Sequence, residues 1–144
     1  MSELYEDDIV LWSERQAEFL RRRASGRLAS DADLDWLNII EEIEGVGSER
    51  LHAVESLLLR ALLHMLQAEA WPQSPSVPHW QSEAKLFRAQ ARRRFVPSMR
   101  QRIDIGGLYR DALRALPSTV DGLPPLQIDT SRQPTLDELL SDTP

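Results

Sequence analysis

The stretch from Leu34 to Trp71 constrains the fold more than any other part of the chain, because it has the pattern of one long helix. Positions separated by alternating steps of three and four residues lie along one stripe of a helix. Nine such positions fall here: Leu37, Ile40, Glu44, Gly47, Leu51, Val54, Leu58, Ala61 and Met65. Seven are apolar; Gly47 would admit a neighbouring helix, and Glu44 stands where a hydrophobe is expected.

The middle of this helix, Leu57 to Leu66, is apolar on nearly every side apart from Arg60 and His64. A helix that is apolar all round lies between neighbours rather than on top of them. We therefore predict that this is the central helix of the fold. Gly45 and Gly47 each cost about 1 kcal/mol relative to alanine, and we expect a continuous helix with a local bend there.

Three further main helices are expected around it. The first, Tyr5 to Leu20, has one apolar face and ends at Ser25-Gly26. The third follows the proline-rich loop 72–78 and has an inner stripe from Trp80 to Phe95. The fourth is Met99 to Leu116. The third helix has a strongly basic outer face. The pattern predicts an all-α fold, an antiparallel four-helix bundle with a long central second helix.

After Pro117 the composition changes to proline, glycine, serine, threonine and aspartate. This predicts an extended arm, lying on the bundle through Leu123, Leu126 and Ile128. Thr135 and Glu138 form a capping-box pair for a short last helix, 136–140. We expect one helical domain over residues 1–144, with a bundle core (1–116) and an arm that ends in the short helix (117–144).

Composition excludes several classes of function. The chain of 144 residues is the size of one domain and has no cysteine, which excludes disulfides, zinc–thiolate sites and thiol nucleophiles. An acidic start and the lack of an uncharged run of about 20 residues indicate neither a secretory signal nor a membrane span. The expected location is the cytoplasm. The net charge of −6 argues against nucleic-acid binding by the whole surface.

The order of features resembles the bacterial family known as domain of unknown function twenty-nine. The resemblance rests on LYEDDIVLW at the start and on DLDWLNIIEEIEGVGSERLHAVESLLLRALLHMLQ in the long helix, followed by Trp80, the arginine-rich helix, Pro97-Ser98, Tyr109, Ala112, GLP at 122–124 and TLDELL at 135–140. The chain departs from the family pattern in EGVGSER, one residue shorter than usual, and at Gln67-Ala68, where a basic residue and an aromatic are usual. The resemblance implies an all-α bundle and no established activity, so it supplies no catalytic residues.

Glu41 and Glu44 are the first candidate polar site. They lie one turn apart, with Glu44 predicted to point inward and Glu41 at the edge of the same face. A buried carboxylate needs a partner. It is either a metal ligand or general acid or base, or it has a structural partner, through an ion pair with an arginine of the third helix or a hydrogen bond to Trp12 or Tyr109. The structural partner is the preferred interpretation.

Arg60 and His64 are the second candidate, because they are four residues apart and share one side of the helix. Some helical-bundle ribonucleases use an arginine followed by a histidine near a helix end, but with more residues between them. We favour a histidine satisfied within the core. Glu49 and His52 match one Glu-x-x-His element of di-iron bundles, yet no second element exists, so no metal or cofactor is expected.

The basic face of the third helix includes Lys85, Arg88, Arg92 and Arg93. Such a face could contact nucleic-acid phosphates or an acidic partner. The aromatic residues of this helix lie on its inner stripe and do not interleave with the arginines, as base stacking requires. We therefore favour contacts between these arginines and the acidic second helix, within the chain or across a dimer.

The sequence has no phosphate-binding glycine loop, nucleophile elbow or dinucleotide fingerprint. The leading hypothesis is a non-enzymatic cytoplasmic helical bundle that acts through protein contacts, with a partner or with itself as a homo-oligomer. The alternatives are a hydrolase or nuclease-like site around Glu44 and His64, and nucleic-acid binding by the third helix. The sequence does not indicate a small-molecule ligand.

Overall fold

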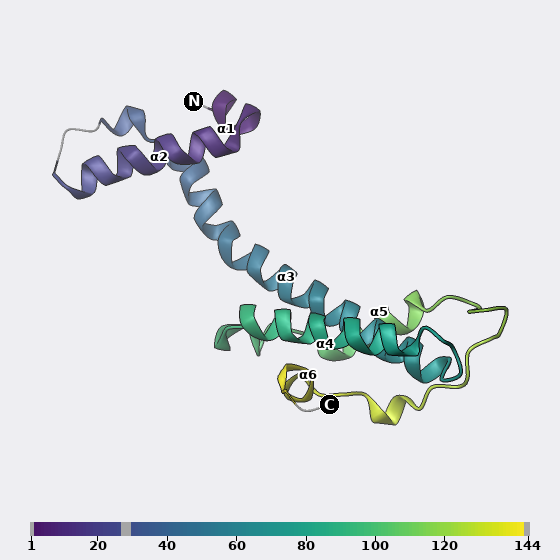
Figure 1. Cartoon of the computed structure of the whole chain (residues 1–144). Helices are drawn as coiled ribbons and strands as arrows, with labels where there is room; N and C mark the ends of the chain where they lie inside the picture. The colour runs from purple at the N-terminus through teal and green to yellow at the C-terminus, as the bar shows by residue number, and fades with distance from the viewer. Residues whose placement is uncertain (1, 27–29, 143–144) are drawn as a thin grey trace. The chain divides into compact units, whose positions relative to one another are not determined.

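The computed structural model describes residues 2–26 and 30–142, and it is all-α, as the sequence predicts. Contacts divide the chain into two compact units, Met1–Ser48 and Glu49–Pro144. Figure 1 shows the helices of each unit. The long helix α3 (Trp36–Ala70) contributes its first third to unit 1 and the remainder to unit 2.

Unit 1 contains α1 (Ser2–Asp7), α2 (Ile9–Ala24), a 3-10 turn (Asp31–Asp33) and the start of α3. The predicted first helix is divided at Asp8, whose side chain accepts a hydrogen bond from the Leu11 amide at 3.0 Å and caps α2. The core of the unit has three buried residues, joined by partly buried neighbours on α1 and α2: Trp12, Leu34 and Ile39, with Leu4, Tyr5 and Phe19. Helix α2, the expected first helix of the bundle, therefore packs within this unit.

A buried glutamine ties α2 to the segment before α3. Gln16 is 7% exposed; its Nε2 donates to the Asp33 carbonyl at 3.4 Å and its Oε1 accepts from the Asp35 amide at 2.8 Å. The Trp12 indole donates to Asp35 Oδ2 at 3.1 Å. Each buried polar group thus has a partner, which removes most of the cost of its burial.

Helix α3 runs unbroken through Gly45 and Gly47, as expected. A Cβ atom built on either glycine meets nothing within 4 Å. The expectation that Gly47 admits a neighbouring helix is therefore not met within the described residues, and neither glycine is required by local packing.

Unit 2 surrounds the apolar middle of α3 with α4 (Val77–Arg94), α5 (Ile105–Ala115) and α6 (Leu136–Leu140). Four leucine and valine side chains of α3 are at most 3% exposed: Val54, Leu58, Leu62 and Leu66. The other helices and the segment between α4 and α5 contribute further buried residues to the same core: Ala91, Met99, Ile103, Tyr109, Ala112 and Leu139. The second half of α3 is therefore the central helix of this unit.

Helix α5 begins six residues later than predicted, because Asp104 caps it. The Asp104 side chain accepts from the Gly107 amide at 3.0 Å, and residues Pro97–Met99 form a separate 3-10 turn. A Cβ on Gly107 would lie 2.6 Å from Asp104 Oδ2. The glycine in the first turn therefore admits the cap rather than weakening the helix.

The arm after α5 lies on unit 2 chiefly through its main chain. The Trp71 indole donates to the Leu123 carbonyl at 2.9 Å, and the Leu126 amide donates to the Ala70 carbonyl at 2.9 Å. The side chains of Leu123 and Leu126 are exposed, contrary to expectation, whereas Ile128 packs against buried Trp71 and Trp80. The short helix α6 has the predicted capping box of Thr135 and Glu138.

We expect the substitution Gly45→Ala to stabilise the protein by about 1 kcal/mol, because alanine is the better helix former and its Cβ meets open space. Urea unfolding followed by circular dichroism measures the change. Gly26→Ala is the contrasting control, because Gly26 has a φ of +77° that strains an L side chain. A loss of stability in Gly45→Ala would show that α3 is not helical at this position.

Candidate functional site

The structure overturns the prediction that Glu44 points inward. Glu41 and Glu44 are both exposed. Unit 1 buries α3 through Ile39, which is five residues and therefore about 140° of helix rotation from Glu44. Glu44 belongs to unit 1 and His64 to unit 2. Arg60, also grouped with the buried polar candidates, is exposed.

Several large apolar side chains of α3 in unit 1 are exposed as well. We call them the exposed seam, defined by five side chains between 43% and 83% exposed: Trp36, Leu37, Ile40, Ile43 and Val46. They make up five of the twelve large hydrophobic residues that are exposed in the described structure, all within eleven consecutive positions. Large apolar side chains that are exposed close together in this way indicate a contact site.

Arg60 and His64 both contact Phe87 of α4. The imidazole stacks on the phenyl ring with centroids 5.6 Å apart and planes at 10°, and the Arg60 guanidinium carbon lies 5.9 Å from the ring centroid. His64 Nδ1 hydrogen bonds to Gln67 Oε1 at 2.9 Å. The half-buried His64 is less exposed than His52 or His79. This cluster joins α3 to α4 by stacking and cation–π contact.

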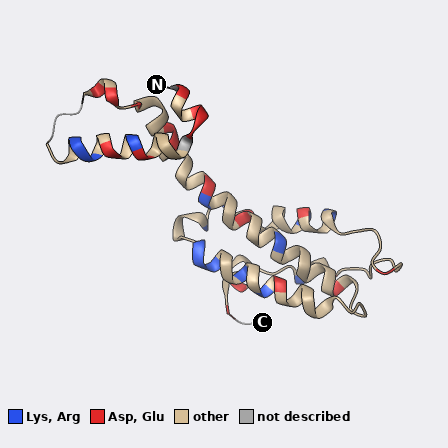
Figure 2. Cartoon of the chain, turned by 45° about the horizontal axis from the view of Figure 1, so that its top comes forward, with Lys and Arg blue, Asp and Glu red and all other residues tan. Residues whose placement is uncertain are grey.

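In unit 1 the electrostatics centre on two acid residues near the start of α3. Tyr5 donates a hydrogen bond to Glu42, and this bond, helped by burial and by the charges of Glu42 and Glu41, raises the pKa of Tyr5 to about 12. Hydrogen bonds from Asn38, then from Trp12, lower the pKa of Asp35 against the effect of burial. Figure 2 shows acidic residues on α1 and basic residues toward the end of α2.

Two arginines of the basic face of α4, Arg88 and Arg92, contact α6 and the residues that follow it rather than the acidic second helix, whereas Lys85 and Arg93 are exposed. Arg88 donates through Nε to the Leu139 carbonyl at 2.9 Å and through Nη2 to the Glu138 carbonyl at 2.9 Å. Arg92 lies 2.7 Å from Asp142. Arg100 pairs with Asp137. Cations at the C-terminus of a helix satisfy its last carbonyls and its dipole, so these arginines dock α6 and are not a free phosphate-binding face.

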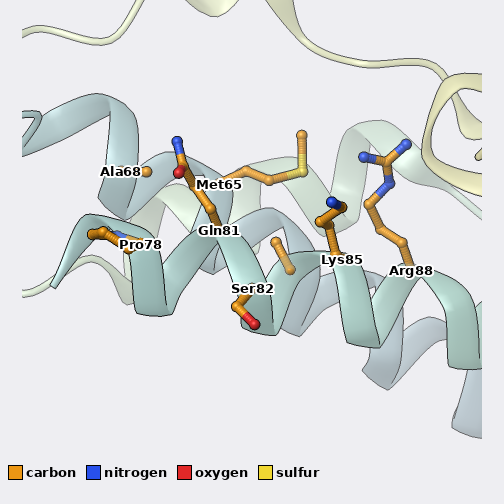
Figure 3. A pocket seen from close by; sticks show the side chains of 8 residues that line it. Met65, Ala68, Pro78, Gln81, Ser82, Lys85 and Arg88 are labelled. Atoms are coloured by element: carbon orange, nitrogen blue, oxygen red, sulfur yellow. The ribbon is translucent and has the colours of Figure 1, made fainter. Parts of the chain in front are cut away.

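A groove runs along α4 where it faces the end of α3. Its volume is about 660 Å³, and its eight lining residues are Met65, Ala68, Pro78, Gln81, Ser82, Ala84, Lys85 and Arg88. In Figure 3, Lys85 and Arg88 stand toward one end and Pro78 and Ala68 toward the other. The lining is apolar at its floor and contains no carboxylate.

Metal-ligating side chains do not converge in the part of the chain that the structure describes: no group of three or more histidine, aspartate or glutamate residues could hold an ion there. Nor does any helix in residues 2–26 and 30–142 have the length and apolarity to cross a membrane.

Sequence reasoning missed three features. The first is the exposure of Ile43 and Val46, which lie outside the expected inner stripe. Their apolar side chains on a second side of the same helix segment were a signal for a second contact face. The docking of α6 by Arg88 could not be foreseen, because the contact joins residues about 50 positions apart. The groove depends on the spacing of two helices, for which the sequence carries no signal.

Residues 4–143 match the family described as "Domain of unknown function DUF29". The chain belongs to this family. It is also similar to a crystal structure of an α-helical protein of unknown function from Rhodospirillum rubrum, with a TM-score of 0.60 and 27% sequence identity over 96% of this chain and 89% of that one. No curated protein matches the sequence. The similar structure agrees with the all-helical fold, and neither comparison supplies an activity.

We expect Arg88→Ala to loosen α6, because the last carbonyls of the helix lose a charged donor. Hydrogen bonds to a charged group contribute about 1.5–3 kcal/mol, so the amides of α6 should exchange with solvent roughly ten-fold to a hundred-fold faster. Hydrogen exchange measured by NMR or mass spectrometry tests this. Arg93→Ala is the matched control, since Arg93 is exposed on the same helix; equal protection of α6 in both variants would contradict this docking.

We expect Tyr5 to ionise near pH 12 instead of 10. A tyrosine whose pKa is raised in the folded state contributes stability below its unfolded pKa, and this contribution is lost as the pH rises toward 12. Ultraviolet titration of Tyr109→Phe, in which Tyr5 is the only tyrosine, measures its phenolate. Adding Glu42→Ala should return the midpoint toward 10, and an unchanged midpoint would rule out Glu42 as the cause.

Proposed function

We propose that this DUF29 protein is a non-enzymatic cytoplasmic protein that acts through association with a second copy of itself, and that the exposed seam forms the contact. The observation that carries the proposal is the exposure of Leu37 (83%) and Ile43 (68%) on one helix. Burying them against another apolar surface is favourable by the hydrophobic effect, and the described residues of unit 1 leave them open to solvent.

The spacing of the seam favours a self-complementary partner. Trp36, Ile40, Ile43 and Gly47 follow steps of four, three and four, which is the period of paired helices. If two seams pair antiparallel about a two-fold axis between Ile40 and Ile43, Trp36 of one copy lies opposite Gly47 of the other. The largest side chain of the seam then faces the position without one. An isologous contact has this reciprocity.

The free energy expected from burying the seam indicates a weak dimer. Complete burial of such a side chain contributes about 1.5–3 kcal/mol, and roughly half of each is still exposed, so each contributes about 1 kcal/mol. Five side chains from each of two copies give about 10 kcal/mol, against an association cost of about 4–15 kcal/mol. The smallest of these costs leaves about 6 kcal/mol, so the dimer should form at roughly tens of micromolar concentration or above.

We expect Ile40→Glu to abolish association, because it places a charge at the centre of the seam. Sedimentation equilibrium over a wide concentration range measures the dimer. Leu86→Glu is the matched control, because Leu86 is also an exposed hydrophobe (50%) but lies on α4. A wild-type chain that stays monomeric at the highest concentration would refute self-association, and equal effects of both variants would place the contact elsewhere.

The register has its own test. Gly47→Trp should weaken the dimer because it places two tryptophans opposite each other, while the isolated chain tolerates it, since a Cβ at Gly47 meets open space. Adding Trp36→Ala to Gly47→Trp exchanges the large and small positions and should restore association. A double variant no stronger than Gly47→Trp alone would exclude the antiparallel register.

A further inference from the structure

The groove along α4 contains the only lysine of the chain. The other 16 side chains of the lysine and arginine type are all arginines. Those on α4 that bond to α6 do so through several N–H donors of one planar guanidinium group. Lys85 has a compact ammonium group on a flexible side chain. It can contact a single anionic group without the paired hydrogen-bond geometry of an arginine guanidinium. The one lysine therefore stands at a groove with no carboxylate in its lining.

We propose that this groove binds a small amphiphilic carboxylate, a molecule with one carboxylate head and an unbranched apolar tail. The Lys85 ammonium group contacts the head, and the tail lies along α4 over Met65 and Ala68. The proposal is independent of self-association, because no residue of the exposed seam lines the groove.

The anionic head follows from the charges. Lys85 has neither an ion pair nor a hydrogen bond to a protein group within the described residues, whereas the neighbouring Arg88 donates to the carbonyls of α6. Gln81 and Ser82 are exposed and lie one turn before Lys85 on the same side of α4, where their amide and hydroxyl can donate hydrogen bonds. A cation with two neutral donors favours a carboxylate.

The apolar tail follows from the lining and the length. Met65, Ala68, Pro78 and Ala84 form the apolar surface, and Met65 has a flexible side chain that adapts to a variable chain. From Pro78 to Arg88 the helix rises about 15 Å. The volume of about 660 Å³ lies within the range of small-molecule sites. The groove opens to solvent along its length, which suits a linear molecule.

The single lysine makes the test direct. Reductive methylation of the full chain with ¹³C-formaldehyde labels Lys85 and the N-terminal amine and retains their charge. Sodium decanoate, added below its micellar concentration, should shift the Lys85 methyl signal with a saturable dependence. Acetate, which has the head without the tail, and decyltrimethylammonium, which has the tail with the opposite charge, should leave it in place at the same concentrations.

Calorimetry of unlabelled variants completes the test. Lys85→Gln should weaken decanoate binding about ten-fold or more, while Arg93→Gln, an equally exposed basic position on α4 outside the groove, should not change it. Leu37→Glu should also leave the affinity unchanged, which distinguishes the groove from the exposed seam. Equal binding by wild type and Lys85→Gln, or loss of binding in Leu37→Glu alone, would overturn the proposal.

Discussion

One apolar stripe on α3 determines how both units are built. Positions 36, 40, 43 and 47 continue the alternation of three and four residues that leads to Leu51, Val54, Leu58 and Ala61. Between Val54 and Ala61 the stripe is at most 1% exposed, because α4, α5 and α6 surround it. Between Trp36 and Val46 the large apolar side chains are mostly solvent-exposed, and Ile39 is the residue of this segment that packs in the core of unit 1. The same pattern thus produces a core in one unit and an exposed apolar surface in the other.

The docking of α6 shows how the charges of the chain are used. A helix of five residues is not stable alone, and α6 depends on burial of Leu139, which is 1% exposed, and on donors from Arg88 at its C-terminal carbonyls. The outer ion pairs, such as Arg92–Asp142, are exposed and contribute little. Arg88 and Arg92 therefore stabilise α6, so two of the four residues of the predicted basic face are engaged within the chain.

The sequence predicts those features that local physics decides. The bounds of α6 and its capping box, the end of α2 and the continuity of α3 through Gly45 all follow from caps and periodicity. It fails where one helix has two apolar sides. Leu37 and Ile40 fit the predicted stripe, yet Ile39 is the residue that unit 1 buries, and only tertiary packing chooses between them. The prediction that Glu44 points inward is wrong for the same reason, because tertiary packing decides which side of α3 is buried. The position of α2 and the partner of Arg88 depend on long-range contacts that periodicity does not encode.

The chemistry of the side chains favours binding over catalysis. Arg60 and His64, the pair most like a nuclease site, contact Phe87 from two positions, and the imidazole also bonds to Gln67. A general base needs a proton to abstract within hydrogen-bond reach and a group that orients it; here the neighbours of the imidazole are an aromatic ring and a neutral amide. Glu41 and Glu44 are exposed carboxylates, which are well solvated and need no partner. Two surfaces would instead be stabilised by contact with another molecule: the apolar seam, which water solvates poorly, and the groove beside the single lysine. The association and the ligand binding proposed above would provide these contacts, and neither requires bond-making chemistry.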